Sequence, residues 1–83
     1  MSKIEINECV ELNNELIKKM KKKAKQLSDI AETLEQIAPM VCITEIHREI
    51  THCMEEIEMA KNRNAKRKKQ LKLLEQLEAL ENE

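Results

Sequence analysis

The chain contains no glycine and no aromatic residue, and a single proline stands among its 83 residues. Without glycine, no residue adopts a positive φ cheaply, so tight hairpin turns and phosphate-binding loops lose their usual parts. The apolar residues that remain are aliphatic side chains, methionine, alanine and cysteine, which make a thin core. These absences argue against sheet folds, nucleotide-binding sites and enzymes of ordinary design.

Charged residues make up 37% of the chain, and the 15 basic and 16 acidic residues leave a net charge of −1. Any attraction to nucleic acid or to an anionic membrane must therefore be local. An apolar core of this size is too small to stabilise an isolated fold of this length. The sequence therefore predicts an obligate oligomer, or a subunit that packs with helices of other chains.

The sequence also indicates an intracellular protein. No apolar run approaches the roughly 18 residues that would span a bilayer, and the opening MSKIEINE is too polar and too acidic for a signal or transit peptide. The three cysteines, Cys9, Cys42 and Cys53, form no CxxC motif. An odd number of cysteines is more typical of reduced thiols in an apolar seam than of a disulfide framework.

A first helix is predicted over residues 3–37. Ser2 and Glu5 have the spacing of a capping box, in which the serine side chain accepts from a free amide at the helix start. Apolar residues then alternate at spacings of three and four, the pattern of a coiled-coil seam, interrupted by one polar residue, Asn13. The predicted seam is Ile6, Val10, Asn13, Ile17, Met20, Ala24, Leu27, Ala31, Leu34, Ala38 and Val41.

Pro39 predicts a break over residues 38–43, because proline donates no backbone hydrogen bond and disfavours helical geometry at the residue before it. Thr44 is a candidate cap for a second helix over residues 44–81. Its seam is expected to continue through Ile43, Ile46, Ile50, Cys53, Ile57, Ala60, Asn64, Arg67, Leu71 and Leu74. The fold class is therefore all-α, a single coiled-coil unit over residues 1–83 that forms a helical hairpin or a kinked rod.

Charge favours the hairpin. Folding back near residue 40 places the lysine block at residues 18–25 opposite Glu55, Glu56 and Glu58, and places residues 61–72 opposite Glu8, Glu11 and Glu15. Such exposed pairs guide orientation more than they stabilise. The kinked rod stays open, because residues 38–44 offer neither glycine nor asparagine for the usual left-handed helix end.

We expect the seam to bind partner helices. Leu12, Leu16, Ile30 and Ile37 lie beside it and widen the apolar face, which suggests packing of three or four helices. The predicted interface consists of Ile17, Met20, Leu27, Leu34, Ile43, Ile46, Ile50 and Ile57, with Leu71, Leu74 and Leu77 as a second contact patch. Strand number and parallel or antiparallel sense are not determined by this pattern.

Residues 61–72 form a basic stretch with seven basic residues and no acidic one: Lys61, Arg63, Lys66, Arg67, Lys68, Lys69 and Lys72. A basic leucine zipper would need a second small residue where Lys66 stands, an arginine where Gln70 stands, and a longer zipper. The pattern therefore argues against DNA reading. A solvated face or a surface for an acidic protein is the favoured interpretation; an anionic lipid surface or a nuclear-import signal at residues 66–69 are alternatives.

Asn64 and Arg67 occupy seam positions, and Asn13 is the polar seam residue of the first helix. Buried polar seam residues cost stability but select register and partner. We interpret the three as register determinants, with an Asn13–Arg67 contact as one hypothesis. The alternative is that the second helix leaves the bundle there and both its polar residues are exposed.

No catalytic, cofactor-binding or metal-binding site is predicted. His47 and His52 are five residues apart, which rotates them by about 140° around a helix, so they do not share an ion with Cys53. The chain also lacks a nucleophile with a base and an orienting acid around a pocket.

The stretch from Leu34 to Ile50, continuing through Met54–Ile57 into Lys66–Leu74, resembles the small helical subunits of the complex for biogenesis of lysosome-related organelles. The likeness is to the subunit-two and pallidin-type members and to the related lysosome-positioning complex. It covers roughly residues 27–77 and consists of two helices around a proline break and a lysine-rich, leucine-spaced ending. It implies a non-enzymatic subunit of an elongated cytosolic complex acting at endosomal or lysosomal membranes.

The sequence therefore predicts a coiled-coil assembly subunit or adaptor in a multi-chain intracellular complex. A kinetochore, centrosome or other cytoskeletal coiled-coil subunit is an alternative of the same class. Binding of DNA or of a membrane surface by the basic stretch is an alternative from a different class.

Overall fold

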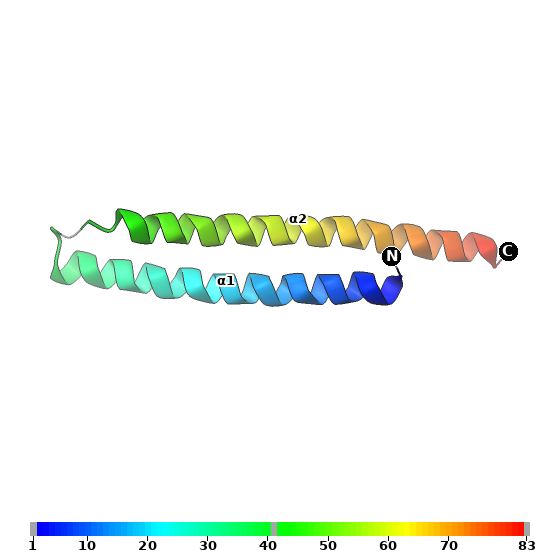
Figure 1. The fold of residues 1–83 in the computed structure, drawn as a ribbon, viewed down its shortest axis with the longest axis horizontal. Helices are drawn as coiled ribbons and strands as arrows, with labels where there is room; N and C mark the ends of the chain where they lie inside the picture. The colour runs from blue at the N-terminus through cyan, green and yellow to red at the C-terminus, as the bar shows by residue number, and fades with distance from the viewer. Residues whose placement is uncertain (1, 41, 83) are drawn as a thin grey trace.

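Two long antiparallel helices form the whole fold. The computed structural model describes residues 2–40 and 42–82, in which α1 (Lys3–Ile37) and α2 (Thr44–Glu81) lie side by side (Figure 1). The Cα positions extend over 70 × 14 × 14 Å, so the molecule is a slender rod. The prediction of an all-α hairpin is confirmed, and the kinked rod is wrong.

The start of α1 is fixed by Ser2. Its Oγ accepts a hydrogen bond from the Glu5 backbone N–H at 3.2 Å and donates to the Glu5 carboxylate at 3.2 Å. The Ile6 N–H donates to the Ser2 carbonyl at 3.0 Å, which closes the first helical turn. The Ser2 hydroxyl thus supplies a partner to one of the first amides of the helix, and the Glu5 carboxylate holds that hydroxyl in place.

Pro39 ends α1 at Ile37. Ala38 leaves helical geometry at φ −146° and ψ 69°, although its N–H still donates to the Leu34 carbonyl at 2.8 Å. No described residue has a positive φ, so the chain reverses without the left-handed helix end that glycine usually provides. Pro39 and Met40 form a turn just after the end of α1.

Thr44 does not cap α2, contrary to the sequence-based expectation. Thr44 is the first helical residue, and the capping position is held by Ile43, whose side chain makes no capping hydrogen bond. The Thr44 hydroxyl lies 3.0 Å from Cys42 Sγ, and this contact lowers the pKa of the exposed Cys42 thiol. The start of α2 therefore lacks the side-chain acceptor that Ser2 gives α1.

Burial follows the predicted seam on both helices. The buried residues are Ile6, Ala24 and Ala31 on α1 and Cys53, Ile57, Ala60 and Asn64 on α2. The remaining seam positions of the described chain up to Leu74 are half-buried. Val41, the last seam position predicted for the first helix, lies outside the described residues. The seam is thus where α1 and α2 pack on each other.

The register differs from the simple reflection about residue 40. That reflection places Asn13 opposite residue 67, whereas Asn13 accepts a hydrogen bond from Arg63 and Asn14 from Asn64. The shift arises because α2 begins only at Thr44, after the connection has run back along the end of α1 (Figure 1). At the open end of the hairpin, α2 consequently extends past the start of α1 (Figure 1).

Candidate protein-binding surface

Most residues predicted to bind partner helices pack inside the hairpin. Ile57 is buried, and half-burial is shared by Ile17, Met20, Leu27, Leu34, Ile43, Ile46, Ile50, Leu71 and Leu74. Leu77 instead remains 51% exposed. The seam therefore joins α1 to α2, while the half-buried positions leave part of their surface accessible beside it.

A second set of apolar side chains lies outside the seam, and we call it the apolar flank. On α1 it includes Leu12, Ile30 and Ile37, which are 65%, 50% and 73% exposed, and the half-buried Leu16. On α2 it includes Met59, Leu73, Leu77 and Leu80, which are 54%, 64%, 51% and 66% exposed. These spacings of three, four and seven residues keep the side chains of each helix on one face.

The flank residues of both helices lie on the same side of the hairpin. Lys23, which is seven residues from both Leu16 and Ile30, forms an ion pair with Glu49 at 3.8 Å. Glu49 stands four heptads before Leu77 on the same face of α2. Since Lys23 and Glu49 meet, the flank residues of α1 and α2 lie on the same side of the hairpin. Between Glu49 and Leu77, the same face of α2 carries Glu56, Arg63 and Gln70.

The opposite side of the hairpin is mainly polar. Seven-residue steps along α1 on that side give Asn7, Asn14, Lys21, Ser28 and Glu35. Met54 and Ile4, 58% and 72% exposed, are isolated apolar side chains there. The exposed apolar side chains therefore gather mainly on the flank side, which they share with charged residues such as Lys23 and Glu49.

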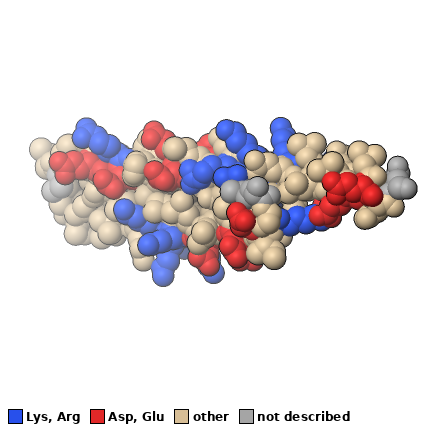
Figure 2. Space-filling view, turned by 45° about the vertical axis from the view of Figure 1, so that its right-hand side comes forward, with Lys and Arg blue, Asp and Glu red and all other residues tan. Residues whose placement is uncertain are grey.

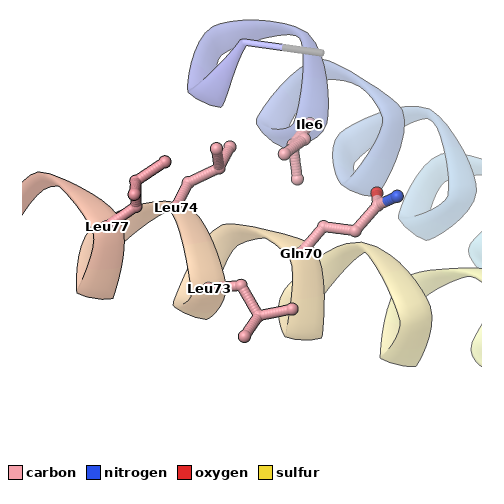
Figure 3. Close-up of a pocket in the computed structure, with 5 residues that line it drawn as sticks. All are labelled: Ile6, Gln70, Leu73, Leu74 and Leu77. Carbon is pink, nitrogen blue, oxygen red and sulfur yellow. The ribbon is translucent and has the colours of Figure 1, made fainter.

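Two shallow grooves run along the apolar flank. The groove at the open end has a volume of about 300 Å³ and is lined by Ile6, Gln70, Leu73, Leu74 and Leu77 (Figure 3). In Figure 3, Ile6 of α1 faces Leu74 and Gln70 of α2, whereas Leu73 points away from α1. The second groove, of about 270 Å³, is lined by Asp29, Ile30, Thr33 and Leu34 near the connection. Both are apolar depressions with room for side chains of another helix.

A polar layer interrupts the seam near the open end. Asn64 is only 7% exposed, and its Nδ2 donates to Asn14 Oδ1 at 2.9 Å. Beside it, Arg63 Nε donates to Asn13 Oδ1 at 3.3 Å, and Arg67 Nη1 donates to Gln70 Oε1 at 2.9 Å. Asn64 is therefore buried, and its proposed exposure to solvent is wrong; the Asn13–Arg67 contact stays a prediction.

Sequence reasoning missed Asn14 as a member of this layer. Asn14 stands one position beside the seam, where a polar residue on a helix is ordinarily solvated. The layer also leaves one buried atom unsatisfied, because Asn64 Oδ1 has no hydrogen-bond partner within the described part of the chain. An unpaired buried acceptor is costly, so this layer weakens the hairpin that it aligns.

The basic stretch points outward. Lys61, Arg63, Lys66, Lys68, Lys69 and Lys72 are exposed, and Arg67 is half-buried. Among the described residues, no ion pair joins its five lysines to a carboxylate. Glu8, Glu11 and Glu15, predicted to face this stretch, are exposed on the outer surface of α1.

The lysine block also pairs differently from the prediction. Within the described chain its ion pair with α2 is Lys23–Glu49, whereas Glu56 lies 3.9 Å from His52 of its own helix. The expectation that Glu55, Glu56 and Glu58 meet the block is therefore wrong. The register shift and the outward position of most block lysines explain the difference.

The described residues contain no group of three His, Cys, Asp or Glu side chains that could hold a metal ion. His47 and His52, which we did not expect to share an ion with Cys53, are exposed, and Cys53 is fully buried. Neither α1 nor α2, as described, carries an apolar stretch long enough to cross a membrane.

In comparisons with known proteins, no family model, no curated protein and no solved structure matched the chain. The surface must therefore be interpreted from its own chemistry.

Proposed function

We propose that this chain is a non-enzymatic coiled-coil assembly subunit or adaptor that packs with helices of other chains in a multi-chain intracellular complex. The observation that carries the proposal is the apolar flank, which lies on one side of the hairpin, between residues 12 and 37 on α1 and at Met59 and residues 73–80 on α2. Monomeric proteins rarely leave an extended apolar surface uncovered, and such surfaces mark sites of protein association. The heptad spacing of its residues fits a partner that is itself a helix.

The small core supports the same proposal. Of the buried apolar residues, only Ile6 and Ile57 are large, and the others are alanines or cysteine. A pair of helices buries only one stripe of each, and a helical hairpin of this size has little stability to spare. Partner helices on the flank would add the burial that two helices alone lack.

We further propose that the complex acts in endosomal or lysosome-related trafficking. This rests on the resemblance of residues 27–77 to small subunits of the complex for biogenesis of lysosome-related organelles. A cytoskeletal or kinetochore complex would use the same surface, so the partners recovered from cells decide between them.

The association is tested by diluting the purified chain while its helicity is followed by circular dichroism and its mass by light scattering. We expect helicity to fall as the mass falls towards that of one chain, because folding and association are coupled. A monomer that melts sharply, is unaffected by dilution and binds no partner in its own cells would contradict the proposal.

The flank is tested with the double variant Ile30→Ser/Ile37→Ser, whose side chains are 50% and 73% exposed. It should lose the partners that the native chain binds in its own cells. The matched control is Met54→Ser, 58% exposed on the polar side, which should keep them. Equal binding by both variants would show that the flank is not the binding surface.

A further inference from the structure

Charge is segregated along the last two dozen residues of the chain. The basic stretch at residues 61–72 contains seven basic residues and no acidic one. Residues 75–83, which we call the acidic tip, contain Glu75, Glu78, Glu81 and Glu83 and no basic residue. Figure 2 shows carboxylates gathered at the tip of the rod and basic side chains further back. The end of α2 therefore carries a basic and an acidic segment whose charges are complementary.

The acidic tip is electrostatically unfavourable in an isolated hairpin. The C-terminal end of a helix carries partial negative charge and favours basic residues, yet the last turn of α2 has none. The ion pair between Lys3 and Glu78 at 2.6 Å links the tip to α1. Glu81 is exposed, and α1 does not reach it (Figure 1). A basic surface placed against the tip would remove this penalty.

The same segment carries an exposed apolar stripe outside the seam. Leu73, Leu77 and Leu80 follow one another at spacings of four and three residues, which aligns them on one helix face. Their exposed fractions are 64%, 51% and 66%. This is the coiled-coil spacing repeated on a second face, separate from the seam that holds Leu71 and Leu74.

We propose that residues 61–83 pair in antiparallel orientation with the same residues of a second copy of the chain. This inference rests on the proposed function and names one partner, the chain itself. A two-fold axis close to the leucine stripe brings the basic stretch of each copy alongside the acidic tip of the other. A parallel pair would place like charges together, so the charge pattern selects the antiparallel one.

The open-end groove gives the second copy a place to dock. Its volume of about 300 Å³ is roughly twice the cavity of about 150 Å³ that holds benzene in an engineered protein, so leucine side chains of the opposing stripe fit. The contact is isologous, since the groove and the stripe belong to both copies. The acidic partner of the basic stretch is then the tip of another copy.

The stripe is tested by sedimentation of the full chain over a wide concentration range. The wild-type mass should approach that of two chains, and Leu77→Ser should weaken the dimer about 100-fold, because symmetry removes two leucine contacts. The control Met54→Ser removes a side chain of comparable exposure, 58% against 51%, from the other side of the hairpin and should change the dimer constant less than about twofold.

The orientation is tested by charge reversal. Lys66→Glu/Lys69→Glu and Glu81→Lys/Glu83→Lys should each weaken the dimer about tenfold, and all four substitutions together should restore it. In a parallel dimer neither pair of substitutions would weaken association, since like charges would stay opposed to like charges. Glu81→Lys places a lysine at the end of α2, which strengthens the helix, so the weaker dimer of this variant does not come from fraying. Raising the salt concentration should weaken the wild-type dimer.

The outcomes separate this inference from the proposed function. If the chain associates but Ile30→Ser disrupts it and Leu77→Ser does not, self-pairing through the tip is overturned while assembly through the flank stands. Self-pairing is also overturned, and assembly through the flank stands, if the chain is monomeric alone yet binds its cellular partners through Ile30 and Ile37. A stable monomer without partners overturns both.

Discussion

The middle of the hairpin and its open end are built from the same heptad pattern but from different side chains. In the middle, the buried residues are Ala24, Ala31, Cys53, Ile57 and Ala60, all apolar and mostly small. At the open end, the buried residues are Ile6 and Asn64, and leucines are only half-buried around a layer of amides and arginines. In the middle, small side chains let the two helices approach closely. At the open end, the polar layer contains a buried acceptor, Asn64 Oδ1, with no hydrogen-bond partner among the described residues, which costs stability.

The difference suggests a division of roles along the rod. The middle supplies the apolar contact that holds α1 and α2 together, and the open end fixes their register. The open end also carries the exposed leucines and the segregated charges with which we propose that a second copy pairs. On this proposal, stability and partner selection depend on separate parts of one short chain.

Replacing Ile57 by alanine should have the largest effect, because Ile57 is the largest buried side chain of the middle and is 6% exposed. Such a substitution costs about 2–5 kcal/mol, which is comparable with the whole stability of a small helical domain. We expect the isolated chain to lose most of its helicity, measured by circular dichroism.

The control for this prediction is Ile37→Ala, which removes the same atoms from a side chain that is 73% exposed. It should leave the melting temperature of the isolated chain nearly unchanged. If both variants melt alike, the middle of the hairpin is not its stabilising region.

The fold was predictable because its signals are local. Heptad spacing, the Ser2–Glu5 capping pattern and Pro39 define two helices and the break between them without reference to distant contacts. The seam residues followed from the same periodicity. Charge opposition gave the correct antiparallel sense, although the individual pairs were wrong.

The register and the binding surface were less predictable, for a physical reason. Residues 38–43 set how far α2 is displaced along α1, and that displacement depends on backbone angles that composition does not specify. Asn13 accepts a hydrogen bond from Arg63, a pair that the simple reflection did not predict. Of the predicted second contact patch, Leu71 and Leu74 are half-buried and Leu77 is 51% exposed.

Asn64→Leu should stabilise the hairpin and loosen its register. The substitution removes an amide whose Oδ1 is unsatisfied and adds apolar contact, a gain of about 1 kcal/mol. The melting temperature should rise by about 4–8 °C. The amide NMR spectrum should show more than one set of signals, because the polar layer no longer selects one alignment of α1 and α2.

The neighbouring exposed amide provides the control for this substitution, since Asn62→Leu adds the same side chain outside the seam. It should change neither the melting temperature nor the number of signals appreciably. A lower melting temperature for Asn64→Leu would mean that the polar layer stabilises the open end.

Ser2→Ala should have a smaller effect, confined to the open end. It removes the acceptor of the Glu5 N–H at 3.2 Å, a loss of about 0.5–1 kcal/mol. Hydrogen exchange should quicken at Glu5 and Ile6 and stay unchanged in the middle. Ser28→Ala, in the exposed interior of α1, should instead slow exchange slightly, because alanine favours helix. Faster exchange throughout α1 in Ser2→Ala would show that the two regions unfold together.

Lys3 should give the smallest effect, and one that depends on pH. Its hydrogen bond and ion pair with Glu78 raise the pKa of the Lys3 ammonium above its ordinary value of 10.5. A raised pKa means that the folded state holds the proton more tightly, so the stabilisation is complete below that ordinary value and is lost as pH rises through the raised pKa. Wild type should melt slightly above Lys3→Met at neutral pH, and the two should converge in strong alkali. The side chains are 36% and 55% exposed, so solvent screens the pair and the difference is small. A difference that persists at high pH would assign the effect to packing of the lysine stem and not to its charge.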